Sequence, residues 1–188
     1  MRSISIKQPL ASLIVTPRED NPNLGIKDIE NRTWKTNFRG TVLIHASAKP
    51  AGIPSELLTN DQFDSLNLNP ESPLWLSCLS AGKYITSAII GKVDIVDCVI
   101  NHQSIWAEKC HESIILDENL MPKKIIHTYY PIVWNWVLAN PVLFDKPILN
   151  IKGKLSFWDF ELPCEHEYMT KFGVTECQNC GKSEYGQK

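Results

Sequence analysis

Gly25-Ile-Lys-Asp-Ile-Glu-Asn-Arg-Thr-Trp34 carries charged side chains between apolar residues that alternate as they do along a β-strand. Its charges include two cations, Lys27 and Arg32, and the carboxylate of Glu30, and the aromatic residue Trp34 ends the stretch. A solvated surface strand does not need this mixture, whereas a site for a polar, planar or anionic ligand does. A structural ion pair is the alternative interpretation, because exposed pairs are common and are worth only about 0–1 kcal/mol.

The segments on either side of this stretch predict short strands and few helices. Pro9 suits the first position of a helix that runs to about Val15, and Gly91 indicates a bulge in the longest β-rich segment. Short strands joined by long connections favour a small, strongly curved sheet or barrel over a doubly wound α/β fold. The expected strands are residues 2–7, 26–33, 41–46, 84–100 and 131–138, and a closing β segment is expected in 147–162. Within 47–82, one helix is expected to start near Pro54 or Ser55 and another to be capped near Asn60-Asp61. A short helix is expected near 104–110, within the otherwise irregular stretch 101–128.

Several residues that can carry chemistry are expected in the core instead. His45 lies in the apolar run 41–46, which predicts a central strand buried on both faces and a satisfied core histidine. Trp134 and Trp136 share one face of a strand, and together with Trp158 they are expected to be mostly core residues.

The composition excludes several functional classes. The 188 residues suit one well-buried domain, and no apolar run approaches the roughly 20 residues of a membrane helix. The N-terminus has no signal-peptide pattern, so a soluble, cytoplasmic protein is expected. Neither Gly-x-Gly-x-x-Gly nor the P-loop pattern occurs, which argues against nucleotide-cofactor enzymes of those types.

The charge is distributed unevenly along the chain. A net charge of -2 argues against a protein that coats nucleic acid by bulk electrostatics. Residues 1–50, however, hold eight Lys or Arg against four acids, a local net charge of +4 around the opening stretch. This segment is either a patch that faces an anion or a solvated basic face.

Several segments occur in an order that is typical of one family: Ser5-Ile-Lys-Gln-Pro9 with Ala11-Ser-Leu-Ile14, Gly25-Ile-Lys27 through Glu30-Asn-Arg32, Phe38-Arg-Gly40, Leu43-Ile-His-Ala-Ser47, Gly91-Lys-Val-Asp-Ile-Val-Asp-Cys98, Trp134-Asn-Trp-Val-Leu138, and Lys152-Gly-Lys154 with Trp158. In this order they resemble the ASCH domain family, named after a domain of the transcription coactivator activating signal cointegrator. The resemblance covers most of residues 1–162. It implies an α+β, mainly β fold, a small PUA-like β-barrel with flanking short helices, and a cleft that holds the signature residues and meets nucleic acid.

The resemblance implies two kinds of function. Some ASCH domains resemble RNA- or DNA-binding modules, whereas some small bacterial members resemble amidohydrolases that deacylate N4-acetylcytidine with a Lys, a Thr and a Glu. Lys27 matches the Lys, but Glu30 occupies the position of the Thr, and Glu108 or Glu112 match the Glu only by their order along the chain. Ribonuclease activity is also associated with the family. Whether this protein is an enzyme stays open, and Lys27 and Glu30 are the catalytic candidates if it is.

For the binding function, the opening stretch supplies complementary groups. Arg32 offers planar, multidentate donors to phosphate or base, Lys27 offers a point charge, and Glu30 can accept from an exocyclic amine such as that of cytosine. The residues expected to contact nucleic acid, RNA or DNA, are Lys7, Gln8, Lys27, Glu30, Arg32, Trp34, Arg39, Ser47 and Lys49.

The C-terminus predicts a small metal-binding unit. Cys164, His166, Cys177 and Cys180 supply the four ligands of a closed tetrahedral zinc site, so the zinc is expected to be structural. Alternatives are a loosely ordered tail with unpaired thiols and a redox pair of cysteines. The predicted organisation is an ASCH domain over residues 1–162 and a zinc-binding tail over residues 163–188, and the tail is a candidate surface for a protein partner.

Overall fold

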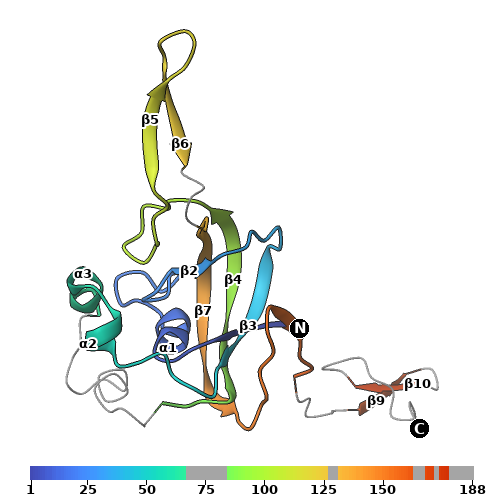
Figure 1. The fold of residues 1–188 in the computed structure, drawn as a ribbon. Helices are drawn as coiled ribbons and strands as arrows, with labels where there is room; N and C mark the ends of the chain where they lie inside the picture. Colours follow the sequence, from blue (N-terminus) through green and yellow to red (C-terminus); the bar gives the residue numbers. More distant parts are fainter. Residues whose placement is uncertain (67–83, 127–130, 163–167, 172–173, 178–188) are drawn as a thin grey trace. The chain divides into compact units, whose positions relative to one another are not determined.

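The computed structural model of the chain describes residues 1–66, 84–126, 131–162, 168–171 and 174–177 (Figure 1). Its contacts divide the chain into two units, one of residues Arg2–Asp159 and one of Met1 with Phe160–Lys188. The smaller unit contains an antiparallel hairpin of β9 (Tyr168–Lys171) and β10 (Val174–Cys177).

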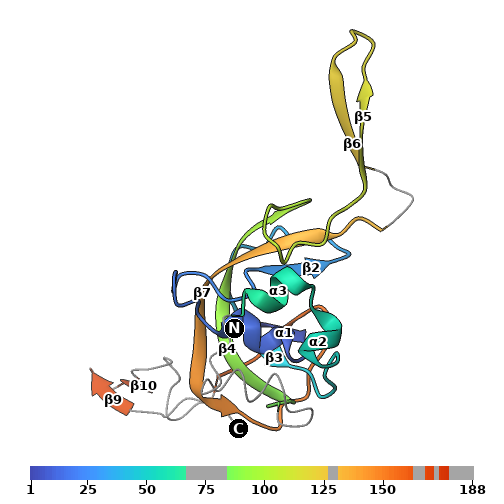
Figure 2. The same ribbon diagram turned by 90° about the vertical axis from the view of Figure 1, so that its left-hand side faces the viewer.

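A six-stranded sheet in the order β2-β7-β4-β3-β1-β8 forms the larger unit. β1 and β3 run parallel, and the other neighbours run antiparallel. The pairing of β4 with β7 shifts register repeatedly along its length, and such bulges bend strands. The sheet therefore curls into part of a barrel (Figure 2). The strands are β1 (Arg2–Ile6), β2 (Ile29–Arg32), β3 (Gly40–Ala46), β4 (Ala88–Val99), β7 (Trp134–Ile148) and β8 (Phe157–Asp159).

Helix α1 (Leu10–Val15) packs against the inner face of this curl. Ala11, Ile14 and Val15 join the main hydrophobic core with inward residues of β1, β3, β4 and β7. The chain after the helix returns along it, because Ile26 N donates to Thr16 O and Lys27 N donates to Leu13 O, each at 3.0 Å. This return places Lys27 just before the edge strand β2.

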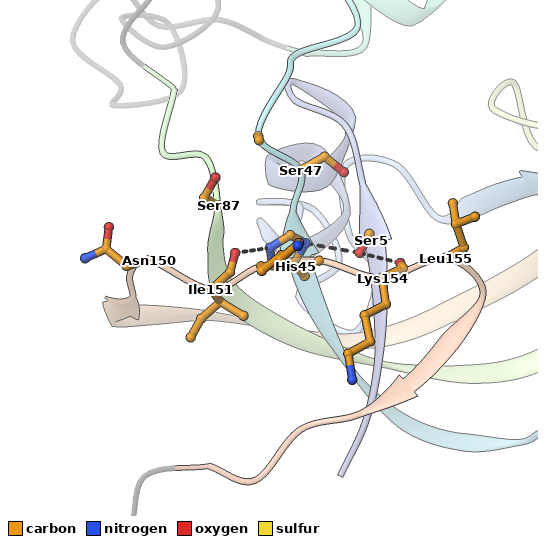
Figure 3. A pocket seen from close by; sticks show the side chains of 11 residues that line it. Ser5, His45, Ser47, Ser87, Asn150, Ile151, Lys154 and Leu155 are labelled. Atoms are coloured by element: carbon orange, nitrogen blue, oxygen red, sulfur yellow. Dashed lines mark hydrogen bonds between the residues drawn. The ribbon is translucent and has the colours of Figure 1, made fainter.

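The strand alternation separates two faces of the sheet. Ile4, Ile6, Ile44 and Ala46 point into the core, so their neighbours on β1 and β3 point to the outer face. Ser5 and His45 are such neighbours, and they lie opposite each other in the β1–β3 register. Figure 3 shows both side chains beneath the segment that carries Ile151 and Lys154.

Several expected elements are confirmed. The strand expected at residues 2–7 and the helix after Pro9 are present, and β3 is an interior strand whose residues 42–46 are buried. The pairing of β4 with β7 shifts register beside Gly91, where a bulge was predicted from the sequence. Helices α2 (Pro54–Leu57) and α3 (Asn60–Asp64) lie where helices were expected. Trp136, 1% exposed, is confirmed as a core residue, and His45 at 1% and Trp158 at 8% are buried as expected, although His45 lies on the outer face of the sheet; Trp134 is only partly buried.

Other expectations were wrong in detail. Residues 104–110 form a short turn followed by irregular backbone and no helix. The stretch expected to be irregular contains the hairpin of β5 (Glu112–Leu116) and β6 (Pro122–Ile126). Its turn is made by Asp117, whose Oδ1 accepts from Asn119 N at 2.8 Å and from Met121 N at 3.0 Å. The N-cap of α3 is Thr59, which forms a capping box with Gln62, and not Asn60-Asp61.

Three strands are joined through Asp94 in β4. Its carboxylate accepts from Thr41 Oγ1 at 2.6 Å and from Asn140 Nδ2 at 2.8 Å. These hydrogen bonds, with Thr41 the larger cause, hold the pKa of the Asp94 carboxyl below its ordinary value. Among the helices that the structure describes, none is long and apolar enough to cross a membrane.

Candidate functional site

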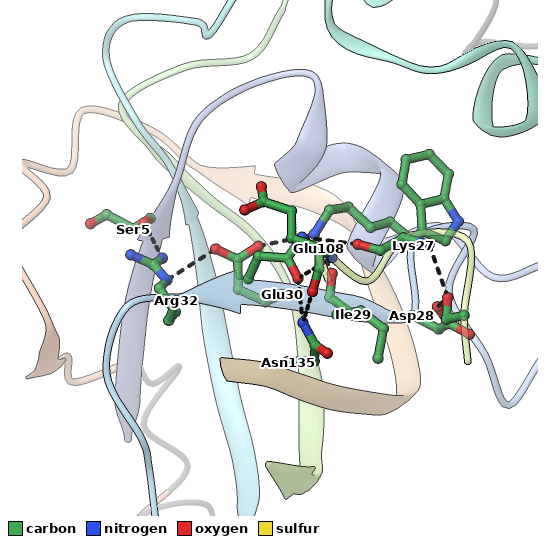
Figure 4. A network of polar contacts seen from close by, with 11 residues as sticks. Ser5, Lys27, Asp28, Ile29, Glu30, Arg32, Glu108 and Asn135 are labelled. Atoms are coloured by element: carbon green, nitrogen blue, oxygen red, sulfur yellow. Dashed lines mark hydrogen bonds and ion pairs between the residues drawn. The ribbon is translucent and has the colours of Figure 1, made fainter. Parts of the chain in front are cut away.

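Lys27, Glu30 and Arg32 form one ion-paired row beside β2, called here the Lys27–Glu30–Arg32 row (Figure 4). Lys27 Nζ lies 3.1 Å from Glu30 Oε2 and also donates to the carbonyl oxygen of Ile29. Arg32 Nε lies 3.0 Å from Glu30 Oε1. One carboxylate is therefore shared by two cations, and the row has a net charge of +1.

The row lies on the inner face of the curled sheet. Glu30 and Arg32 are opposite Trp136 and Trp134 in the β2–β7 register, and residues directly opposite each other share a face. Trp136 belongs to the main core. The exposed fraction of the side chains rises along the row from 5% at Lys27 to 11% at Glu30 and 24% at Arg32. Arg32 is thus the member of the row that a ligand can reach.

Arg32 also bridges two strands that are distant in the sheet order. Its guanidinium donates to Ser5 O on β1 at 3.1 Å, across the side of the curl where β2 and β1 are not paired. The Nε–H of Arg32 has no aligned hydrogen-bond partner, although Glu30 Oε1 is near, so the contact with Glu30 is electrostatic. The carboxylate of Glu30 therefore compensates the charge of this buried donor without forming an aligned hydrogen bond to it.

Two asparagines hold the loop 101–111 against the outer face of β2 and β7. Asn31 Nδ2 donates to Trp106 O at 2.9 Å, and Asn135 Nδ2 donates to Asn31 Oδ1 at 2.9 Å and to Glu108 O at 3.1 Å. Neither asparagine was predicted from the sequence to have this role. Their contacts fix the backbone of Glu108 beside β2 and leave its side chain exposed.

The second candidate carboxylate, Glu112, is engaged elsewhere. Its side chain contacts Lys124 of the neighbouring strand and Asn101. These partners, Lys124 the larger, lower the pKa of the Glu112 carboxyl. Of the two carboxylates, Glu108 is the one whose backbone bonds to the strand that carries Glu30.

The family model described as the ASCH domain matches residues 4–148. The chain belongs to the ASCH domain family. The match covers most of the chain and includes the whole Lys27–Glu30–Arg32 row, which confirms the resemblance drawn from the sequence. No curated protein matches the chain significantly.

The other residues expected to contact nucleic acid occupy different environments in this ASCH domain. Lys7 and Lys49 are exposed, and Ser47 is partly exposed. Gln8 is only 1% exposed. Its Nε2 donates to Ile85 O at 2.9 Å, and its Oε1 accepts from the backbone and hydroxyl of Ser12. The polar character of Gln8 therefore serves internal hydrogen bonds, and its side chain does not form part of an exposed rim.

Trp34 and Arg39 are both engaged within the ASCH domain. The ring of Trp34 packs edge-on against Trp136 at 4.6 Å between centroids and is partly buried. Arg39 lies 2.9 Å from Asp97 and also donates to the carbonyl oxygen of Thr36. The backbone N–H of Cys98 and the Arg39 guanidinium lower the pKa of the Asp97 carboxyl. Arg39 is exposed, but its charge is already paired.

The predicted zinc ligands cannot be placed in the same way. Cys164, His166 and Cys180 lie outside the residues that the structure describes, and for Cys177 only the backbone is described, as the last residue of β10. Within the described part of the chain, no three His, Cys, Asp or Glu side chains come close enough together to hold a metal ion.

Proposed function

We propose that this ASCH domain binds single-stranded nucleic acid, with RNA as the first candidate and DNA as the alternative, through the Lys27–Glu30–Arg32 row. The observation that carries the proposal is the unbalanced charge of the row. Two largely buried cations share one carboxylate, and the side chain of Arg32, 24% exposed, is the most accessible of the three. A phosphate oxygen that contacts the accessible part of the Arg32 guanidinium would supply the missing negative charge.

The neighbouring groups suit a strand rather than an isolated anion. Glu30 accepts a hydrogen bond from Lys27 at Oε2, so its remaining lone pairs can accept from an exocyclic amine. Trp34, two residues after Arg32, is partly exposed and offers part of an aromatic face to an unpaired base. Lys7 and Lys49 are exposed and make no ion pair among the described residues, so they can follow a phosphate backbone.

Arg32→Gln is expected to weaken the binding of a fluorescent single-stranded RNA of about 12 nucleotides by roughly 10- to 100-fold. The reason is that hydrogen bonds to charged groups contribute about 1.5–3 kcal/mol. The salt dependence of log K should also become shallower by about 0.7 for each lost phosphate contact. Fluorescence anisotropy titrations at several salt concentrations measure both quantities, and single-stranded DNA and duplex RNA of the same sequence establish the preferred nucleic acid.

Arg18→Gln is the matched control for this experiment. Arg18 has a similarly exposed side chain, at 33%, and is ion-paired with Asp20 and Asp28 and not with Glu30. The Arg18→Gln substitution removes the same charge as Arg32→Gln, and it should change the affinity for the single-stranded RNA less than threefold. If the Arg32→Gln and Arg18→Gln variants bind the RNA with equal affinity, the row is not part of the binding site.

The alternative function is a hydrolase in the same place, acting on a modified nucleoside such as N4-acetylcytidine or on RNA. It is favoured by the contact between Lys27 and Glu30, because a desolvated Lys beside a carboxylate is an arrangement that can transfer protons. Glu108 is a further carboxylate whose backbone is hydrogen-bonded to β2, through Asn31. For the binding function we expect no turnover of N4-acetylcytidine or RNA; turnover by the protein that is lost in Lys27→Ala would establish the hydrolase instead.

For the C-terminal unit we propose a structural zinc ion held by Cys164, His166, Cys177 and Cys180. The pairing of β9 with β10 supports it, because Cys177 lies opposite Tyr168, only two residues after His166. The hairpin thus places the backbone of Cys177 beside the start of β9, a position that His166 precedes by two residues in the sequence.

The purified protein is expected to contain about one equivalent of zinc, since structural sites bind zinc tightly. Elemental analysis should find that Cys180→Ser loses most of it, whereas Cys110→Ser, which changes a thiol of the larger unit, retains it. Less than about half an equivalent in the unaltered protein would contradict the site.

A further inference from the structure

We propose that a second site, on the outer face of the sheet, binds a phosphorylated ligand of nucleotide size. The site is an open pocket of about 710 Å³, called here the outer-face pocket, within the larger unit. This volume lies in the range of roughly 300–1,000 Å³ that is typical of small-molecule sites. Its polar lining includes Ser5, His45, Ser47, Asn150, Lys152 and Lys154 (Figure 3).

The outer-face pocket is separate from the Lys27–Glu30–Arg32 row. Ser5 and His45 project from the face of β1 and β3 opposite to the core, whereas Glu30 and Arg32 share the inner face with Trp136. The two sites meet only at Ser5, whose side chain lines the pocket and whose carbonyl oxygen accepts from Arg32. The proposal therefore does not rest on the function proposed for the row.

The floor of the pocket is built from specific polar contacts. His45 is 1% exposed, and its Nε2 lies 3.0 Å from Ile151 O, a group that only accepts, so this nitrogen carries a proton. Its Nδ1 lies 3.1 Å from Ser5 Oγ, which lies 3.0 Å from Lys154 O. The histidine thus holds the segment 151–154 against the sheet through both ring nitrogens.

Gly153 is what lets this segment lie directly on the histidine. A Cβ at this position would be 2.5 Å from His45 Cε1 and 2.7 Å from Ser5 Oγ, closer than real contacts allow. The close approach fixes the backbone between Lys152 and Lys154. The two lysines therefore flank a rigid point of the pocket wall.

The charge of the lining points to an anion. Lys152 and Lys154 are exposed, neither is ion-paired among the described residues, and the pocket lining contains no Asp or Glu. Two lysines close in sequence can share the oxygens of one phosphate. Ile151 and Leu155, the latter 95% exposed, add apolar surface for an organic group attached to that phosphate. A nucleoside phosphate combines these features, either as a free mononucleotide or as the phosphorylated end of a strand.

The test is a two-dimensional NMR titration of the full-length protein with adenosine monophosphate. The backbone amide signals of Ser5, His45 and Gly153 are expected to shift and saturate, while the side-chain Nε–Hε signal of Arg32 stays in place. The double variant Lys152→Gln/Lys154→Gln should weaken this binding about tenfold or more. Lys146→Gln, which removes an exposed lysine of β7 outside the pocket, should leave it unchanged.

Three further ligands separate the sources of the phosphate. Adenosine should bind much more weakly than its monophosphate, and a trinucleotide with a 5′-phosphate should bind more tightly than the same trinucleotide with a 5′-hydroxyl. If the protein binds the phosphorylated trinucleotide more tightly than the mononucleotide, the ligand is a strand end. If it binds the trinucleotide equally or more weakly, the ligand is a free nucleotide. The proposal is overturned if the monophosphate does not shift these signals at millimolar concentration, if the double variant binds it as well as the unaltered protein, or if only inorganic phosphate binds. None of these results depends on whether Arg32→Gln weakens RNA binding.

Discussion

Glu30→Ala is expected to lower the free energy of unfolding by about 3–5 kcal/mol, the range measured when one partner of a buried ion pair is removed. Glu30 is the only acidic side chain that the structure places on Lys27 and Arg32 among the described residues. Its loss leaves two cations that are 5% and 24% exposed without a carboxylate. Urea denaturation followed by circular dichroism measures the change.

Two variants show whether charge is the cause. Glu30→Gln keeps the shape of the side chain and its hydrogen-bonding oxygen, so it should be less destabilising than Glu30→Ala. Glu56→Ala removes an exposed carboxylate of α2 and should change the free energy of unfolding by less than about 0.5 kcal/mol. A loss below about 1 kcal/mol for Glu30→Ala would mean that water already compensates the two cations, and that the row is not a buried network.

Gly91→Ala is expected to destabilise the sheet by about 3 kcal/mol, at the upper end of the usual effect of overpacking. A Cβ at this position would lie 2.3 Å from Val142 O and 2.9 Å from Val15 Cβ. Gly91 pairs with Ile44 on β3 and Leu143 on β7, so the strands on both sides restrict its movement. Relief therefore requires the backbone of β4 and β7 to separate beside α1.

Gly52→Ala is the comparison for this substitution. The nearest atoms to its Cβ belong to the flexible side chain of Leu57, at 3.3 Å or more, and it should change stability little. The midpoints and slopes of urea denaturation for the two variants test the difference. Similar stabilities for Gly91→Ala and Gly52→Ala would show that the bulge beside Gly91 accommodates a side chain.

The sequence predicted those elements whose signals are local. The apolar run at 41–46 marks an interior strand because it is buried on both faces, and Gly91 marks a bulge because only glycine fits between the carbonyl of Val142 and the side chain of Val15. The hairpin of β5 and β6 was missed although Asp117 provides a turn signal. The two strands of this hairpin, β5 and β6, are mostly exposed, so their residues lack the alternation of apolar and polar side chains that identifies a half-buried strand.

The members of the Lys27–Glu30–Arg32 row were recognised from the sequence, but their arrangement was not predictable in full. Glu30 and Arg32 share a face because they are two residues apart on a strand. Lys27 precedes β2, and its position follows from the hydrogen bond of its backbone to Leu13 O on α1. The bond from Arg32 to Ser5 O depends on how far the sheet curls, which no local pattern reports.

Gln8 and the outer-face pocket illustrate the same limit. Gln8 follows a strand and is polar, which predicts exposure, yet its amide is buried because it links the start of α1 to Ile85 O, 77 residues away. The pocket forms only because the segment 151–154 crosses His45, 106 residues earlier in the chain than Ile151. Contacts of this sequence separation are set by the whole fold.

The side-chain Nε–Hε signal of Arg32 in a two-dimensional NMR spectrum tests the central claim most directly. This group lies beside Glu30 Oε1 in the free protein, and a phosphate of single-stranded RNA bound to the accessible part of the same guanidinium is expected to change its environment. The signal should therefore shift during a titration with RNA, with the same concentration dependence as the anisotropy, while the corresponding signal of Arg18 stays in place. RNA that saturates the protein and leaves the Arg32 signal unmoved would contradict the account.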